Sequence, residues 1–326
     1  MTSFNPYSGN SFFEFFMTLI VRIWQLMSGA LSFSSLASDE VQMIVLSLVA
    51  VSSAMVGTFL VLRRMTMLAN SLSHTILLGI VLAFFLTKDH FIGSKGAYSE
   101  PIDMQTMLIA SLLTGIATTF LTEFLTKTVR LQEDASTGLV FTTLFALGII
   151  LVTLLTRNAH VGTEVVMGNA DALHIDDCAF IFLILFLNSC LFFLFFKEFK
   201  ITTFDPGLSK ALGISVVFYN YLLMAQVSLT AIGAFRAVGV LMLLSFITGP
   251  ALTARLLTSH LNKMFLISIL IGILASVLGV ALSRHILSFY GVALSTGGIV
   301  VCLIFAIFLI TVFFKQFLIK RFHCSQ

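Results

Sequence analysis

The chain has 326 residues, of which 58% are hydrophobic and only 10% are charged, and its mean hydropathy is +1.06. This composition lies far outside that of soluble domains and is typical of a polytopic membrane protein. The net charge of +3 is small and gives no support to a nucleic-acid partner. The polar stretches are too short to form a soluble domain, so we expect any energy source or high-affinity receptor to lie on another chain.

The predicted elements begin with the apolar run 12–33, which carries Glu14, Arg22 and Gln25. This run is either a helix lying in the membrane interface or a membrane span. Since about 20 apolar residues cross a bilayer core, the rest of the chain predicts nine spans. They are 41–62, 68–87, 105–126, 136–156, 178–196, 214–234, 237–257, 264–283 and 298–318. The expected fold class is all-α, a polytopic bundle of transmembrane helices with an interfacial or tenth helix at the N-terminus.

Orientation follows from Lys and Arg, which accumulate on the cytoplasmic side of membrane proteins. If Arg63 and Arg64 are cytoplasmic, the alternation of spans places twelve of the 18 basic residues on that side. We therefore expect an N-terminal extension over 1–40, a transmembrane domain over 41–318 and a cytoplasmic tail over 319–326.

The longest predicted cytoplasmic connection is the loop 197–214. Its segment DPGLSKALG predicts a short helix with Asp205 as the N-cap, Pro206 in the first turn and Gly213 at the end. Such a helix suits docking to a soluble partner. The alternative is a loop that lies on the lipid headgroups.

Four segments together resemble the permease subunits of ATP-binding-cassette importers for zinc, manganese and iron, the ABC-3 family. GTFLVLRRMTMLANSLSHTILLGI (57–80) is similar to the family's glycine, paired arginines and DALSH motif, and LQEDASTGLVFTTLFALGIIL (131–151) to its acidic pair and FALG pattern. FDPGLSKALGI (204–214) resembles the family's docking segment, and VGVLMLLSFITGPALTARLL (238–257) its helix ending in P-A-x-x-A-R. The order and spacing of the four make the resemblance specific over about residues 41 to 318.

The resemblance implies the membrane-spanning permease subunit of an ATP-driven importer of a divalent transition metal (Mn, Zn or Fe), a multi-pass protein of the bacterial inner membrane. It implies three protein partners: a cytoplasmic ABC ATPase, an extracytoplasmic metal-binding protein, and a second permease subunit in a homo- or heterodimer. Because the chain has no Walker A pattern, we expect ATP hydrolysis on the separate ATPase and no enzyme activity here. The metal would be cargo, and no permanently bound cofactor is expected. The docking residues implied are Asp205, Pro206, Gly207, Lys210, Ala211 and Gly213.

The polar turn in RRMTMLANSLSHT (63–75) is the candidate metal half-site. His74 lies six residues into the span that starts near Leu68, which is roughly 9 Å deep at 1.5 Å per residue. Asn70 and His74 are four residues apart and share one side of the helix with Ser71 and Ser73, and such groups must face protein or a water-filled path. Neutral imidazole and amide or hydroxyl oxygens bind Mn, Fe and Zn without trapping them.

We therefore predict His74 and Asn70 as metal ligands and Ser71 and Ser73 as path-lining residues. The alternative is that these groups only hydrogen-bond neighbouring helices. Asn70 departs from the family, which usually has aspartate at this position. An amide lacks the negative charge, which a heterodimer with an acid-bearing second permease would restore.

Other candidates rank lower. Glu123 is either a residue that lines the exit of the path or a snorkelling surface acid. Glu133 and Asp134 precede a helix, where acids favour the N-terminal dipole. His174 and His285 are weaker candidates for the entrance of the path or for contact with a binding protein.

The predicted seventh span contains Gly239, Gly249 and Pro250, which allow close packing and a local break that a gating helix could use. The alternative function is an ion-coupled secondary transporter of a small solute or cation. Such proteins usually carry several intramembrane acids, whereas the predicted spans contain hardly any acid beyond Glu123.

Overall fold

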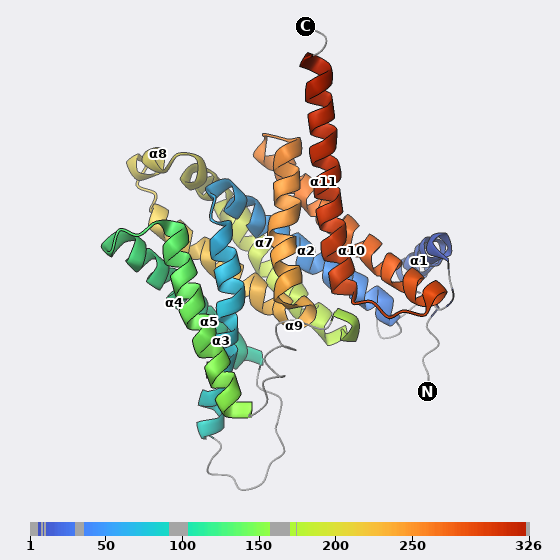
Figure 1. Ribbon diagram of the computed structural model, residues 1–326, viewed down its shortest axis with the longest axis horizontal. Coiled ribbons are helices and arrows are strands. Elements are labelled where there is room, and N and C mark those ends of the chain that lie inside the picture. The colour runs from blue at the N-terminus through green and yellow to red at the C-terminus, as the bar shows by residue number, and fades with distance from the viewer. Residues whose placement is uncertain are drawn as a thin grey trace. The chain divides into compact units, whose positions relative to one another are not determined.

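The computed structural model describes residues 6–7, 9, 11–29, 36–90, 104–156, 170–173 and 175–323. Every regular element in these ranges is a helix (Figure 1), which confirms the all-α class. The elements are α1 (Phe12–Met27), α2 (Ser38–Arg63), α3 (Thr66–His90), α4 (Met104–Thr128), α5 (Glu133–Thr156), the 3-10 turn η2 (Ala170–Ala172), α7 (Ile175–Phe204), α8 (Pro206–Ala211), α9 (Val216–Leu257), α10 (Leu261–Tyr290) and α11 (Thr296–His323).

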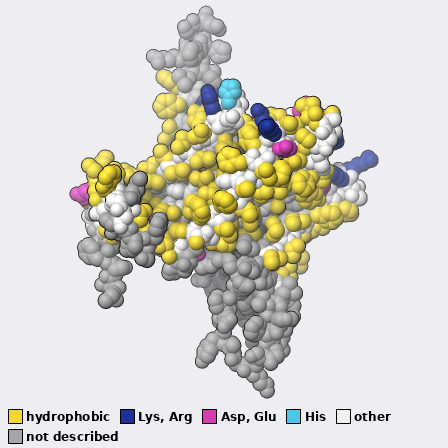
Figure 2. Space-filling view, turned by 180° about the vertical axis from the view of Figure 1, so that it is seen from behind, with side chains coloured by type: hydrophobic (Ala, Val, Ile, Leu, Met, Phe, Trp, Pro, Cys, Tyr) yellow, Lys and Arg dark blue, Asp and Glu magenta, His cyan; other side chains and the backbone are white. Residues whose placement is uncertain are grey.

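Seven stretches of the described helices are long and apolar enough to cross a membrane: Ser38–Arg63, Asp134–Leu151, Asp177–Phe204, Val216–Ala234, Ala237–Leu257, Leu261–Tyr290 and Thr296–Phe317. They coincide with seven of the predicted spans. Helices α3 and α4 cover the positions of the other two, 68–87 and 105–126. Hydrophobic side chains spread over most of the described surface that Figure 2 shows, and Phe193 and Leu154 are 84% and 71% exposed. Such a surface suits contact with lipid tails.

The predicted loop 197–214 is wrong in its first half, because α7 continues to Phe204. The backbone bends at Phe195 (φ −111°, ψ 22°) and then returns to helix. Thr202 and Thr203, which read as loop residues, donate hydrogen bonds to the carbonyls of Glu198 and Phe199 at 2.8 and 2.6 Å. Helices α10 and α11 likewise extend beyond the predicted spans, since a helix need not end where its apolar run ends.

The chain divides into two compact units, and each is described by itself. The first comprises Met1–Thr58, Asn169–Phe186 and Ala237–Gln326. Its core forms where small residues let helices approach closely. A Cβ at Gly57 of α2 would lie 1.9 Å from the carbonyl oxygen of Ile247 in α9, and one at Gly272 of α10 would lie 3.0 Å from the Cβ of Ala50.

The second unit comprises Phe59–Gly168 and Leu187–Arg236. Its helix α3 packs against both α4 and α5. The rings of Phe59, Phe192 and Phe199 form a fully buried cluster with centroids 5.3 to 5.7 Å apart. This unit holds the predicted metal half-site.

Candidate functional site

His74 lies in α3 against two aromatic rings of α5. Its imidazole centroid is 5.1 Å from that of Phe141 and 5.3 Å from that of Phe145. The side chain is half-buried, and its Nδ1 is enclosed without a hydrogen-bond partner. A buried nitrogen of this kind requires an explanation, because most buried polar atoms are paired. The Nδ1 of His74 is therefore a buried polar atom whose partner the described part of the chain does not supply.

Two of the residues around His74 on α3, Ser71 and Thr75, face protein. Ser71 is 1% exposed and its Oγ has no hydrogen-bond partner. Thr75 is fully buried, and the Thr118 hydroxyl of α4 donates to it at 3.1 Å. Asn70 is half-buried, and the side chain of Ser73 lies outside the described part of the structure. The role of the turn in metal binding stays a prediction.

Two buried polar residues of α9 were missed by the sequence analysis. Gln226 is 1% exposed with neither amide atom bonded, and Ser228 is fully buried with an unpaired Oγ. Helix α4 comes close here, since a Cβ at Gly115 would lie 2.0 Å from the Ser228 Oγ. A glutamine inside an apolar run was the signal that could have found this position.

Glu123 lines a cavity of about 190 Å³ in the same unit. The cavity walls come from α3, α4, α9 and the turn before α3: Met65, Leu68, Thr119, Thr122, Glu123, Thr126, Lys127, Asn220 and Met224. The Glu123 carboxylate pairs with Lys127 one turn further along α4 and hydrogen-bonds with Tyr221. It therefore faces a cavity and is neutralised locally, and its role in an exit path stays a prediction.

Arg63, the first of the paired arginines, donates hydrogen bonds to three neutral side chains. Its Nε donates to Thr203 Oγ1 at 2.9 Å, its Nη2 to Thr202 Oγ1 at 2.8 Å, and its Nη1 to the Asn220 side chain. It thus ties the end of α2 to α7 and α9. Arg64 is exposed and has a left-handed backbone (φ 61°).

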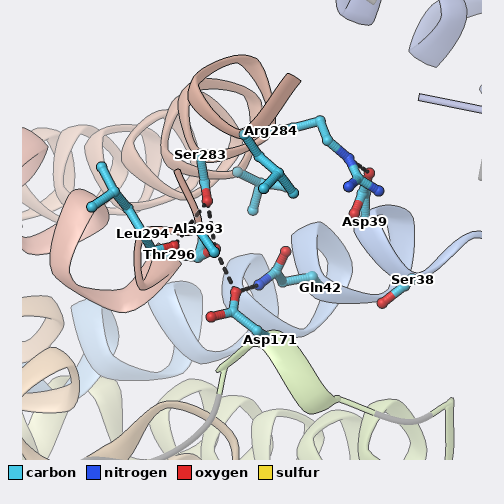
Figure 3. Close-up of a pocket in the computed structure, with 11 residues that line it drawn as sticks. Ser38, Asp39, Gln42, Asp171, Ser283, Arg284, Ala293, Leu294 and Thr296 are labelled. Atoms are coloured by element: carbon cyan, nitrogen blue, oxygen red, sulfur yellow. Dashed lines mark hydrogen bonds and ion pairs between the residues drawn. The ribbon is translucent and has the colours of Figure 1, made fainter. Parts of the chain in front are cut away.

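A second polar site lies in the first unit (Figure 3). Asp171 of η2 accepts hydrogen bonds from Gln42 of α2 at 2.9 Å and from Thr296 of α11 at 2.6 Å. Asp39 accepts from Arg284 of α10 at 2.7 Å. These residues line a cavity of about 280 Å³. Asp171 therefore links α2, η2 and α11 within this unit.

The short helix α8 forms as the sequence predicts. Asp205 caps it by accepting a 2.9 Å hydrogen bond from the Leu208 amide, Pro206 opens it, and Gly213 (φ 76°) follows its end. Leu208 and Leu212 are 49% and 58% exposed. Gly207, Lys210 and Ala211 are exposed as well. The helix therefore presents a free surface, and its use for docking stays a prediction.

Helix α9 has a non-helical residue, Gly239 (φ 74°, ψ 172°), at the start of the predicted gating span. A Cβ at Gly249 would meet the Ile304 side chain of α11 at 2.3 Å, and Pro250 lies inside the helix. The break and the close approach are present. Gating stays a prediction.

The lower-ranking candidates are scattered. His285 stacks near Phe289 and Phe12, with centroids 4.7 and 6.2 Å away. Asp134 is exposed at the start of α5, while His174 and the Glu133 side chain lie outside the described part. Within the described residues, no three His, Cys, Asp or Glu side chains gather as a metal site.

Long apolar helices, a polar turn in α3 and a capped surface helix together define a polytopic membrane protein of the helical-bundle class. The chain belongs to the ABC 3 transport family, whose family model matches residues 40–315. It is 42% identical over 322 residues to a metal transport system membrane protein of Chlamydia muridarum, with 98% of each chain covered. It is 40% identical over 246 residues to the manganese transport system membrane protein MntD of Bacillus subtilis, covering 71% of this chain and 79% of that one.

The fold has a close counterpart among solved structures. PsaBC from Streptococcus pneumoniae, in complex with Fab, superposes with a TM-score of 0.69 and 28% identity, covering 83% of this chain and 89% of that chain. The chain is therefore a multi-pass membrane protein of the bacterial inner membrane and the permease of an ABC-type metal transport system. Its relatives are membrane subunits of transport systems, so the molecule is a translocation component.

Proposed function

We propose that this permease imports a divalent transition metal through the polar turn of α3. The metal is delivered by an extracytoplasmic binding protein, and ATP hydrolysis on a separate ABC ATPase drives the movement. Manganese is supported by the Bacillus subtilis relative and zinc by a further relative, the zinc transport system membrane protein TroD of Treponema pallidum; iron stays a prediction. The ion is cargo, so no permanently bound cofactor is part of the proposal.

The observation that carries the proposal is the unpaired Nδ1 of His74 with the unpaired Oγ of Ser71 one turn away on α3. A divalent ion that leaves water needs lone-pair donors to replace its hydration. Imidazole nitrogen and hydroxyl or amide oxygens serve Mn, Fe and Zn in this way. Asn70 completes the set, with Ser73 as a further path-lining residue.

Uptake of radioactive manganese or zinc into proteoliposomes that hold the complete transporter tests the proposal. We expect His74→Ala to reduce uptake by about tenfold or more, since disturbing a metal's ligand environment commonly costs 10- to 100-fold in affinity. His260→Ala is the control, because His260 is exposed before the first residue of α10 and its side chain makes no capping hydrogen bond. Unchanged uptake by correctly folded His74→Ala protein would remove His74 from the path.

We also propose that the permease acts as a dimer in which the partner is a second permease. Two polar turns would then offer two histidines to one ion. Because Asn70 lacks the charge of the family's usual aspartate, an unlike partner that carries the acid would give a stronger site. A purified homodimer with full transport activity would contradict the heterodimer.

The remaining assignments concern the rest of the chain. We propose α8 and its flanks as the ATPase-docking element and Gly239, Gly249 and Pro250 as parts of a gating helix. Residues 1–40 form an extension, 41–318 the permease domain and 319–326 a cytoplasmic tail. The family match over 40–315 supports these boundaries. Metal uptake without any co-purifying ATPase would favour a secondary transporter instead.

A further inference from the structure

Helix α1 has two opposite faces. Its inner face is tied to the rest of the first unit: Phe15 is 1% exposed and packs on Tyr7 with centroids 4.7 Å apart. Phe12 contacts the ring of His285 in α10 at a centroid distance of 6.2 Å. The helix is therefore held in place by protein on one side.

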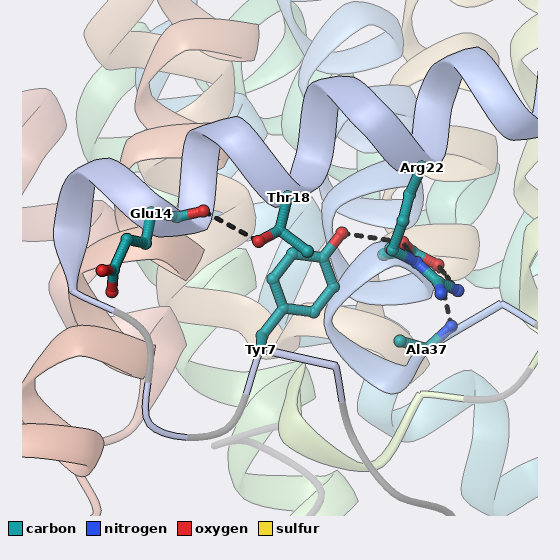
Figure 4. Close-up of polar contacts among 6 residues, drawn as sticks. Tyr7, Glu14, Thr18, Arg22 and Ala37 are labelled. Atoms are coloured by element: carbon teal, nitrogen blue, oxygen red, sulfur yellow. Dashed lines mark hydrogen bonds and ion pairs between the residues drawn. The ribbon is translucent and has the colours of Figure 1, made fainter.

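The charge of Arg22 on the inner face is neutralised by Glu40, in the first turn of α2. Figure 4 shows Tyr7, Arg22 and Ala37, the three residues that bond to this carboxylate. The Glu40 carboxylate is 5% exposed. It accepts hydrogen bonds from the Tyr7 hydroxyl at 2.7 Å, from Arg22 Nη2 at 3.1 Å and from the Ala37 amide at 2.8 Å, and Arg22 Nε bonds to it as well. Burial, together with the hydrogen bond to Glu40, raises the pKa of the Tyr7 hydroxyl far above its usual range, so this donor keeps its proton.

The outer face of α1 is apolar and uncovered. Phe13, Met17, Ile20 and Trp24 are 80%, 70%, 63% and 73% exposed. Their spacing of four, three and four residues places them on a single stripe of the helix. No charged residue lies on the stripe, because Glu14 and Arg22 belong to other faces.

The length of α1 is too short for a span. Its N-terminus is fixed by a capping box between Ser11 and Glu14, and the chain turns at Gly29 (φ 74°) after the last helical residue, Met27. Sixteen residues rise only about 24 Å, less than the roughly 30 Å of a hydrocarbon core. The helix is also tied to the first turn of α2, a membrane-spanning helix. The first turn of such a helix lies at the edge of the hydrocarbon core of the bilayer.

We propose that α1 is an interfacial helix that lies along the bilayer surface, with Phe13, Met17, Ile20 and Trp24 inserted among lipid acyl chains near the headgroups. Tryptophan prefers this depth in membrane proteins, and an amphipathic helix of low charge on its apolar side binds there. The hydrogen bonds of Tyr7 and Arg22 to Glu40 fix the depth of α1 at the level of the first turn of α2. In the predicted orientation this is the extracytoplasmic surface.

Trp24 is the only tryptophan of the chain, so its fluorescence reports on α1 alone. We reconstitute the full chain in phosphatidylcholine vesicles that carry bromine near the carbonyl end, at mid-chain or at the methyl end of the acyl chains. The expected result is strongest quenching by bromine near the carbonyl end. Strongest quenching by bromine at the methyl end would show that α1 spans the bilayer and would overturn the proposal. Absence of quenching at all three positions would show that the stripe faces water or another protein surface, which would also overturn the proposal.

Two variants sharpen the experiment. Met17→Asp places a charge on the stripe and is expected to reduce the quenching of Trp24 severalfold, because the helix lifts from the acyl chains. Gln25→Asp adds the same charge at an exposed position away from the stripe and is expected to leave the quenching unchanged. Equal effects of the two variants would contradict an inserted stripe. Quenching is independent of transport, so its failure is separable from failure of the proposed function.

Discussion

The paired arginines at the end of α2 have different surroundings. Arg63 donates to Thr202, Thr203 and Asn220, whereas Arg64 points to the surface and is exposed. Hydrogen bonds that involve a charged donor are stronger than neutral ones. We therefore expect the stability of this region to depend on one of the two arginines.

Arg63→Ala should lower the free energy of unfolding by about 2 to 3 kcal/mol, because three acceptors lose their donor in a part-buried place. Arg64→Ala removes the same charge at an exposed position and should change stability by less than about 0.5 kcal/mol. Thermal unfolding of the detergent-solubilised protein measures both. A similar loss for the two variants would show that the charge, and not the hydrogen bonds, matters.

For individual residues, the sequence predicted which side chains face protein better than it predicted their hydrogen-bond partners. The burial of Ser71 followed from a polar group in an apolar run, because such a group must face protein. The acceptors of Arg63 did not follow, since Thr202 and Thr203 lie about 140 positions away and nothing local indicates the pairing. Gln226 was overlooked although a glutamine inside an apolar run is a local signal; only the missing hydrogen-bond partners of its amide depend on how the helices pack.

Glycines of the helices fall into those that contact another backbone and those that do not. Gly57 of α2 leaves no room for a Cβ, because the Ile247 carbonyl oxygen would be 1.9 Å away. Gly138 of α5 is also helical, and a Cβ there would meet nothing within 4 Å. The two positions form a natural pair for testing how helices meet.

Gly57→Ala should destabilise the protein by about 1 to 3 kcal/mol or more, since the obstacle is main chain that cannot rotate away. Gly138→Ala should stabilise it by up to about 1 kcal/mol, the difference in helix propensity. The midpoint of thermal unfolding in matched detergent measures both. Tolerance of alanine at 57 would mean that α2 and α9 pack less tightly than described.

Element boundaries were predictable where local chemistry sets them. The ends of α8 came from Asp205 and Gly213, whose roles are local. The end of α7 was missed, because the polar stretch after the apolar run looked like a loop while its threonines bond back to the helix. The tie between α1 and Glu40 depends on tertiary contact and could not be predicted.

At the scale of the whole molecule, composition and the order of the four motifs were enough to predict the class of protein.

The proposed assembly with an ATPase depends on α8, whose Lys210 is exposed. Lys210→Glu should reduce both ATPase co-purification and ATP-driven metal uptake severalfold, because charge reversal at a docking surface weakens association. Lys263→Glu makes the same change at an exposed residue of α10 on the predicted cytoplasmic side, and should leave both unchanged. Equal effects would remove α8 from the docking surface.

Arg64 and Arg130 follow the ends of α2 and α4, and both have a left-handed backbone, with φ of 61° and 58°. Glycine is the residue that this conformation favours after a helix, and a side chain there costs about 1 kcal/mol. During biosynthesis, however, a positive charge beside a span decides which end of the helix stays in the cytoplasm. At both positions a residue suited to membrane insertion occupies a backbone conformation that glycine adopts more easily. A glycine at either position would relax the backbone, and the growing chain would lose one of the charges that orient it as it enters the membrane.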